Sequence, residues 1–348
     1  SQQAIKGWKD WIDDAKDRGL KRAHNYTKIP VKWTNIAVTM GDGAIRADPI
    51  ALMEKTREKL SKLWNAEDES EKHDGNEEAE KEDAATEILP KLTRLPAEKL
   101  RMAAKSFSGA TTSTFDGMHP KHGEAMSDDG LDALSAFYSV CEATGMWPEG
   151  INAVVSAQIP KPTGGTRPIG LFAGWYRLWA RARRDIADQW ERDNAEPFFA
   201  ASAGQSAVDT VWKQAFWAER AVRKNHASAA VLVDLRAFYE HIDCKVLKER
   251  AEKEGFDKVV TRLAIAGYKA PRIIQMRGKA AAPLWARRGV IAGCGFATTF
   301  VKVFYRTPFK EFAKRNPGVT IDAYIDDVTL SASGASEKEV EVLLVKAT

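Results

Sequence analysis

The pattern of apolar and polar positions changes its period several times along this chain. Apolar residues recur every three to four positions over 5–20, 49–63, 96–107, 128–144, 174–190, 206–224, 245–255, 258–268 and 293–312, and this spacing predicts helices. Alternation or short apolar runs predict strands over 151–160, 167–172, 229–235, 272–276 and on both sides of a turn within 319–331. Helices and short strands in one chain indicate an α/β (α+β) fold class.

The stretch Val319–Ser331, VTIDAYIDDVTLS, alternates on both sides of two adjacent acids. We predict a β-hairpin whose tight turn is formed by Asp326 and Asp327. Two neighbouring carboxylates repel each other, and a cation between them would relieve this repulsion. Asp is also a common turn residue, so an ordinary acidic turn is the alternative interpretation.

Another acid closes a buried strand upstream of this hairpin. The run Ala229–Leu235, AAVLVDL, carries Asp234 at its end, where a carboxylate is costly unless it is paired or binds a metal. If this strand lies beside the hairpin, Asp234, Asp326 and Asp327 converge at one edge of a sheet. Three carboxylates around hard divalent ions are what a two-metal phosphoryl-transfer site requires.

Composition narrows the class of protein only slightly. The 348 residues are 44% hydrophobic and 29% charged, which indicates a globular chain large enough for two subdomains. A formal charge of +4 is compatible with nucleic acid but is not evidence for it. Three well-separated cysteines without a CxxC pair argue against a disulfide framework or a zinc site. The sequence shows no transmembrane run and no signal peptide, so no membrane partner is expected.

Two charged segments stand out from the globular pattern. Residues 66–86, AEDESEKHDGNEEAEKEDAAT, have almost no large apolar side chain, so we expect a disordered acidic linker that lies away from any nucleic-acid channel. A basic cluster follows the first helix. It comprises Lys16, Arg18, Lys21, Arg22, His24 and Lys28, with Tyr26 among them. This cluster is either a nucleic-acid arm or a solvated charged face.

Five motifs, in the correct order, resemble those of a known family. AVLVDLRAFYEHI, GVIAGCGFAT and AYIDDVTL resemble the palm motifs of reverse transcriptases, most closely those of non-LTR (LINE-type) retrotransposons and more distantly those of group II intron proteins. QIPKPTGGTRPIGL, followed by WYRLWARARR, resembles the fingers motif, and FDGMHP resembles the element before it. The resemblance spans roughly Leu95 to Ser333. It implies right-hand polymerase fingers and palm, with an antiparallel palm sheet backed by helices.

The resemblance also implies an activity and its cofactors. The expected reaction is RNA-templated DNA synthesis, as part of a retrotransposon polyprotein, with an RNA template, a DNA or RNA primer and dNTPs as partners. Asp234, Asp326 and Asp327 would be catalytic. Together with the backbone carbonyl of Leu235 they would hold two Mg²⁺ (or Mn²⁺) ions. An intracellular site, in the nucleus or cytoplasm, is expected, and the oligomeric state is open.

Four further residues are implied to bind the nucleotide: Lys161, Arg167, Tyr239 and Gly293. A guanidinium such as Arg167 can grip a triphosphate bidentately, although a solvated hairpin tip is the alternative. Tyr239 occupies the position of the steric gate that excludes a 2′-hydroxyl, unless it is simply a core aromatic. Gly293 would leave room for the template–nucleotide pair, since a Cβ there would push the base pair away.

Three arginines of the predicted helix 174–190 alternate with aromatic residues. Arg177, Arg181 and Arg184 could lie along a nucleic-acid backbone, and we predict this role for them. The alternative is that the aromatic side chains face the core and the arginines face solvent.

The expected domain organisation follows these patterns. We expect an N-terminal helical extension at 1–65, the acidic linker at 66–87, fingers and the fingers–palm connection at 88–228, and a palm at 229–348, without a thumb. Two departures from the family weaken the functional expectation: Ala292 replaces the usual Gln and Ala297 the usual Ser. A catalytically idle or domesticated RNA-binding protein is therefore one alternative. An RNA-dependent RNA polymerase is another, against which Tyr239 counts.

Overall fold

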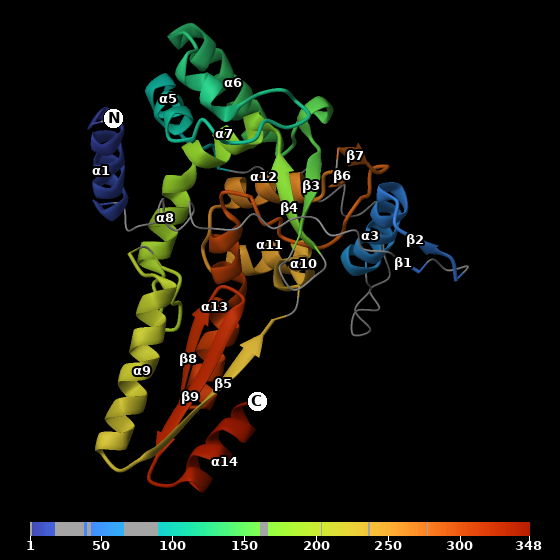
Figure 1. Cartoon of the computed structure of the whole chain (residues 1–348). Coiled ribbons are helices and arrows are strands. Elements are labelled where there is room, and N and C mark those ends of the chain that lie inside the picture. The colour runs from blue at the N-terminus through green and yellow to red at the C-terminus, as the bar shows by residue number, and fades with distance from the viewer. Residues whose placement is uncertain are drawn as a thin grey trace.

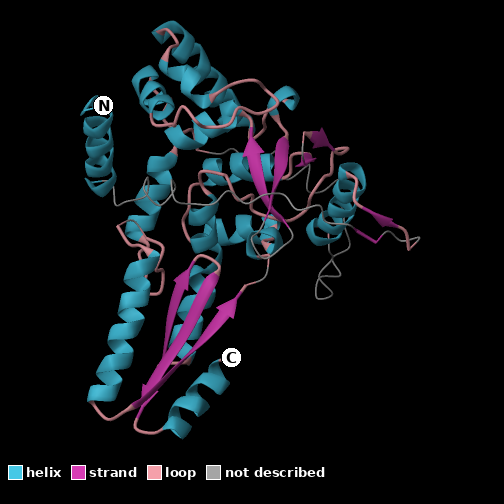
Figure 2. Cartoon of the chain, in the orientation of Figure 1, coloured by secondary structure: helices cyan, strands magenta, loops and turns pink. Residues whose placement is uncertain are grey.

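The computed structural model describes residues 2–17, 38–39, 43–65, 90–160, 166–202, 204–235, 237–276 and 278–348. The expected acidic linker, the basic residues 18–28 and Lys161 lie outside these ranges. The described strands form three sheets, of two, four and three strands, and helices pack around the two larger ones (Figure 2). None of the described helices is long and apolar enough to span a membrane.

The helices are α1 (Gln2–Asp17), α3 (Pro49–Trp64), α5 (Ala97–Lys105), α6 (Asp128–Thr144), α7 (Gly174–Ala182), α8 (Arg184–Asp193), α9 (Ala207–Arg223), α10 (Phe238–His241), α11 (Cys244–Lys253), α12 (Lys258–Tyr268), α13 (Ala297–Arg315) and α14 (Glu337–Ala347). The strands are β1 (Val38–Thr39), β2 (Ile45–Arg46), β3 (Val154–Pro160), β4 (Thr166–Phe172), β5 (Ala227–Asp234), β6 (Arg272–Met276), β7 (Lys279–Ala280), β8 (Val319–Tyr324) and β9 (Asp327–Gly334).

A three-stranded antiparallel sheet occupies the C-terminal part of the chain, in the order β5-β9-β8. Alternate residues of β8 and β9, such as Ile321 and Leu330, pack into one core with Phe309 of α13 and Leu344 of α14. Helices therefore back one face of this sheet, while α9 runs alongside it (Figure 1). The expected antiparallel sheet with helices behind it is confirmed.

A second sheet of four strands has the order β4-β3-β6-β7. β3 and β4 form the predicted hairpin, and β6 pairs with β3 in parallel. β6 comes from the segment assigned to the palm, so the chain returns from there to extend the hairpin sheet. A large aromatic core lies around this sheet. It includes Tyr138, Trp147, Tyr176, Trp179, Phe296 and Phe300.

The predicted single helix over 174–190 is wrong, because the structure has two helices that meet at Arg183. The Arg183 guanidinium donates two hydrogen bonds of 2.7 Å to the carboxylate of Glu142, and Trp179 donates a third of 2.9 Å. Both charged side chains are buried, with 6% and 5% of their surface exposed. The break therefore follows from a contact with α6, which no local pattern contains.

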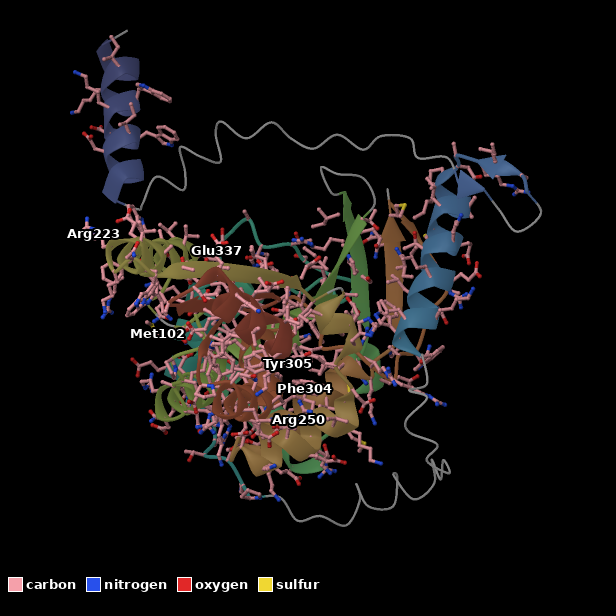
Figure 3. All side chains as sticks on the ribbon, turned by 90° about the horizontal axis from the view of Figure 1, so that it is seen from below. Met102, Arg223, Arg250, Phe304, Tyr305 and Glu337 are labelled. Carbon is pink, nitrogen blue, oxygen red and sulfur yellow. The ribbon has the colours of Figure 1, made fainter. Side chains whose placement is uncertain are left out.

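The helix predicted over 293–312 begins later, at Ala297. Gly293 has a φ of +119°, which no helix can use, so the chain forms turns before α13 starts. Farther along α13, the guanidinium of Arg250 from α11 lies 4.0 Å from the ring centre of Phe304 and donates to the Phe304 carbonyl (Figure 3). These contacts fix α13 against α11, and α13 in turn supports the three-stranded sheet.

Candidate active site

The hairpin that carries the acids turns through Ile325 and Asp326. β8 ends at Tyr324 and β9 begins at Asp327, and these two residues are cross-strand partners. The predicted turn at Asp326 and Asp327 is therefore wrong by one residue. Asp327 cannot be a turn residue because it pairs in the ladder on both sides, with Tyr324 and with Asp234.

Strand register gathers the three aspartates at one end of the sheet. Asp234 is the last residue of β5 and the cross-strand partner of Asp327. One residue later, the backbone N–H of Leu235 donates to the carbonyl of Asp326 at 3.4 Å. Asp234 and Asp327 are exposed, and Asp326 is half-buried. The backbone thus presents three carboxylates from two separate segments at an accessible sheet end.

The backbone is strained on both sides of these aspartates. Ile325 has a φ of +61° and Ala237 one of +50°, and they are two of the three non-glycine residues with positive φ in the described ranges. A residue held in this region costs about 1–3 kcal/mol, and a β-branched side chain makes it a clear outlier. Strain of this kind persists where the surrounding structure fixes it, and it is frequent at functional sites.

Tyr239 lies on α10, just after β5, and its hydroxyl lies within the field of Asp326. Burial raises the pKa of Tyr239 to about 12, and the negative charge of Asp326 adds to the rise. The ring meets Phe238 edge-on, with 5.5 Å between ring centres, and the Tyr239 carbonyl accepts a 2.9 Å hydrogen bond from Val290. The residue is half-buried, so it packs on the core and also borders the acidic sheet end.

The hairpin of β3 and β4 carries the predicted phosphate-binding arginine. Arg167 is the second residue of β4, opposite Ile159, and its side chain is exposed. Lys161 follows β3 and falls outside the described residues. An exposed guanidinium at a hairpin tip is free to meet an anionic ligand, which suits the predicted role.

Gly293 is required by the fold itself. An added Cβ would lie 2.3 Å from the carbonyl oxygen of Gly170 in β4, and the φ of +119° is unfavourable for other residues. The N–H of Gly170 also donates to the carbonyl of Ala292 at 2.9 Å. This close backbone contact joins the segment before α13 to the hairpin sheet. The predicted contact with nucleotide stays a prediction.

The three arginines of α7 and α8 have partners inside the protein. Arg177 donates to the Thr112 carbonyl at 2.7 Å, Arg181 lies 4.9 Å from the ring centre of Phe107, and Arg184 donates to Asp188 at 2.7 Å. Burial lowers the pKa of Arg177, although the nearby Asp116 opposes this. These contacts give each arginine a structural role, and their predicted contact with nucleic acid stays a prediction.

The donor chemistry at the sheet end suits a divalent cation. Carboxylate and carbonyl oxygens from Asp234, Leu235, Asp326 and Asp327 are the ligand types that Mg²⁺ and Mn²⁺ prefer. Within the described ranges, however, no three His, Cys, Asp or Glu side chains lie close enough together to hold a metal ion. The residues therefore fit the ions by donor type and strand register, and not as a preformed cluster of side chains.

Sequence reasoning missed a buried ionic cluster beside Tyr239. Glu240, the next residue, accepts a hydrogen bond from the indole of Trp64 and lies 3.7 Å from a guanidinium nitrogen of Arg272. The available signal was an arginine at the start of the mainly apolar strand β6, RIIQM. A charge in that position needs a buried partner.

The fold and the acidic sheet end define a class of protein. A helix-backed antiparallel sheet with aspartates at its hairpin, beside a sheet with a basic hairpin, is typical of the palm and fingers of a nucleic-acid polymerase. The family model described as "Reverse transcriptase (RNA-dependent DNA polymerase)" matches residues 159–347, more than half of the chain. The chain belongs to the reverse transcriptase family.

Other comparisons add little to this assignment. No curated protein matches the chain. Among solved structures, apo telomerase from Candida tropicalis, truncated from the C-terminal domain, is similar with a TM-score of 0.42 and 12% sequence identity. The similarity covers 64% of this chain and 52% of that chain, so the chain spans about half the length of that structure.

Proposed function

We propose that this protein copies RNA into DNA for a retrotransposon of the non-LTR type, as the fingers and palm of its reverse transcriptase. Membership of the family supports the polymerase activity. The observation that carries the residue assignment is the strand register, which aligns Asp234 with Asp327 beside Asp326. The proposed partners are an RNA template, a DNA or RNA primer and dNTPs, inside the cell, in the nucleus or cytoplasm.

The proposed mechanism assigns each carboxylate a role in holding cations. Asp234 and Asp326, with the carbonyl of Leu235, would hold two Mg²⁺ or Mn²⁺ ions, and Asp327 would support them from the outer side. Bound ions of this kind activate the primer 3′-hydroxyl and stabilise the departing pyrophosphate. Because Asp234 and Asp327 are cross-strand partners in the ladder, their backbone positions are fixed before the ions bind.

The nucleotide would be held by residues other than the three aspartates of the acidic sheet end. Arg167, with Lys161, would bind the triphosphate, since a planar guanidinium donates two parallel hydrogen bonds to phosphate oxygens. Tyr239 would lie beneath the sugar and exclude a 2′-hydroxyl. The Tyr239 carbonyl accepts a hydrogen bond from the Val290 N–H, and the Tyr239 ring packs edge-on against Phe238. These two contacts would hold the ring in place beneath the sugar.

Replacement of Asp326 by Asn tests the assignment of the acidic sheet end. Asp326→Asn keeps the size of the side chain and removes its charge, so we expect the full-length protein to lose primer extension on an RNA template. The loss should be at least about a hundredfold, the scale found for single groups that stabilise a transition state. Primer extension with dNTPs and Mg²⁺ measures it, with RNA affinity measured alongside.

A matched control separates this effect from a general loss of negative charge. Asp132→Asn removes a charge from an exposed position on α6 and should leave extension unchanged. Extension by Asp326→Asn at the wild-type rate would show that the acids have been misassigned. RNA affinity should be the same in all three proteins.

An idle RNA-binding protein derived from a reverse transcriptase is the second candidate. Ala292 and Ala297, in place of Gln and Ser, favour it because alanine cannot hydrogen-bond template or nucleotide. Wild-type protein that binds RNA but extends no primer with Mg²⁺ or Mn²⁺ would support this candidate. Extension with rNTPs in preference to dNTPs would instead indicate an RNA-dependent RNA polymerase.

A further inference from the structure

The C-terminal end of α3 is bound to α10 through a buried cluster of three side chains. Trp64 is 1% exposed, and its indole N–H donates to Oε2 of Glu240. The guanidinium of Arg272 lies 4.4 Å from the ring centre of Trp64 and 3.7 Å from the same Glu240 oxygen. We call these residues the Trp64–Glu240–Arg272 cluster. It joins the N-terminal segment to the helix of Tyr239.

The cluster is held rigidly because its charges are buried. Arg272 is 2% exposed and donates to the carbonyls of Tyr268, Arg288 and Gly289 at 3.2, 2.9 and 3.0 Å. Burial raises the pKa of Glu240 and lowers the pKa of Arg272, and each charge opposes the shift of the other. Loss of either partner would leave a buried charge without compensation, so the two side chains have little freedom to separate.

A backbone connection runs in parallel with this cluster. The N–H groups of Arg287 and Arg288 both donate to the carbonyl of Trp64 at 3.2 Å. The next residues, Gly289 and Val290, donate to Ile242 and to Tyr239 at 2.8 and 2.9 Å. Segment 287–290 therefore bridges the end of α3 to both sides of α10.

Gly289 shows how closely this bridge approaches the cluster. Its φ is +102°, and an added Cβ would lie 3.1 Å from the Arg272 guanidinium and 3.3 Å from the Glu240 carboxylate. The bridge and the cluster thus contact each other directly. They act on α10 as one support.

α10 depends on such contacts for its position. It has only four residues, too few to form a stable helix alone. On its other side, Phe238 stacks on Tyr305 of α13, with 5.1 Å between ring centres. Tyr239 lies between these two supports, and its neighbour Glu240 is the residue that α3 holds.

We propose that α3 positions Tyr239, so that the N-terminal segment sets how strongly the nucleotide site discriminates against ribonucleotides. Trp64 and Glu240 are positioning residues in this proposal, because they act through α10 and do not touch the nucleotide. The inference rests on the proposed function for its link to sugar selection. The positioning of α10 itself can be measured without any activity.

The test replaces Trp64 by Phe in the full-length protein. Trp64→Phe keeps an aromatic ring over Arg272 but removes the N–H that binds Glu240. We expect the ratio of kcat/KM for dNTP to that for rNTP to fall about tenfold, as for the loss of a hydrogen bond to a charged group. The KM for dNTP should rise while template affinity is unchanged. Lys62→Ala, on the exposed side of α3, is the matched control and should match wild type.

Amide hydrogen exchange of residues 238–241 provides the second readout. Trp64→Phe should speed this exchange, and so should Glu240→Gln, which keeps an acceptor for the indole but leaves the buried charge of Arg272 without a partner. Lys62→Ala should leave the exchange at its wild-type rate. If Trp64→Phe lowers the melting temperature but leaves exchange and discrimination at wild-type values, the cluster is only structural and the proposal is wrong.

The two proposals fail in different ways. Wild-type protein that extends no primer would refute the proposed function, and exchange in 238–241 would then decide the positioning of α10 alone. Exchange in Trp64→Phe at the wild-type rate would overturn the positioning of α10 by α3, and faster exchange in this variant would support it. Wild-type extension combined with unchanged discrimination in Trp64→Phe would overturn the inference and leave the proposed function intact.

Discussion

Tyr239 has two sets of neighbours, the core behind its ring and the acidic sheet end beside its hydroxyl. A half-buried aromatic can contribute to stability, to sugar selection or to both, and the two contributions respond to different substitutions. Its raised pKa, about 12, keeps the hydroxyl protonated at any physiological pH. In the proposed role, the neutral ring and not a phenolate would therefore meet the sugar.

Substitution of Tyr239 by Val should admit ribonucleotides. The smaller side chain leaves space for a 2′-hydroxyl, and we expect discrimination between dNTP and rNTP to fall by more than about tenfold, or ~1.4 kcal/mol. Tyr239→Phe keeps the ring and serves as the control, with discrimination close to wild type. Steady-state kinetics with each nucleotide measures this. If Tyr239→Val has a lower melting temperature and an unchanged sugar preference, Tyr239 is a packing residue and not a steric gate.

Arg167 is the residue whose loss should affect nucleotide binding most directly. Arg167→Ala removes a charged, bidentate donor, and each such hydrogen bond contributes about 1.5–3 kcal/mol. We expect the KM for dNTP to rise roughly tenfold or more, with template affinity nearly unchanged. Arg315→Ala removes a charge from the exposed end of α13 and is the control. A loss confined to template affinity would instead place Arg167 in the nucleic-acid channel.

Gly293 shows why an element can begin later than its sequence suggests. The apolar pattern of α13 extends back towards Gly293, but the backbone there lies so close to β4 that an added Cβ would be 2.3 Å from the Gly170 carbonyl oxygen. That contact comes from β4, more than a hundred residues upstream. The sequence shows a glycine and not the reason for it.

Replacement of Gly293 by Ala should destabilise the protein. The new Cβ would clash with backbone and the φ is unfavourable, so we expect a loss of about 1–3 kcal/mol in the free energy of unfolding. Urea denaturation measures it. Gly150→Ala is the control, because Gly150 has ordinary φ and open space around its Cβ position. Unchanged stability in Gly293→Ala would mean that this backbone contact gives way easily.

Where both ends of an element carry strong local signals, as in α6, its bounds were predicted, whereas bounds fixed by distant contacts were not. α6 begins after Ser127, whose side chain accepts from Gly130, and ends at the left-handed Gly145, so both ends are readable from the sequence. The break at Arg183 depends on Glu142, and no pattern within 174–190 reveals it. The turn at Ile325 was missed because a β-branched residue with positive φ is rare.

At the scale of the whole molecule, the gathering of the three aspartates was predictable while their support was not. The sequence predicted that the aspartates converge if the strand of Asp234 lies beside the hairpin, and the observed pairing of β5 with β9 meets this condition. The hydrogen bond between Trp64 and Glu240 joins residues 176 positions apart. Neither residue lies in a local pattern that indicates the other as its partner. Contacts of this range are set by the assembled fold.

The contacts of two buried arginines also bear on where this protein can be cut. The family model begins at residue 159, but Arg183 and Arg272 take their partners Glu142 and Trp64 from before that point. A fragment trimmed to the family boundaries would retain Arg183 without its carboxylate and Arg272 without the indole that covers it. We therefore expect such a fragment to be less stable than the protein that retains α3 and α6.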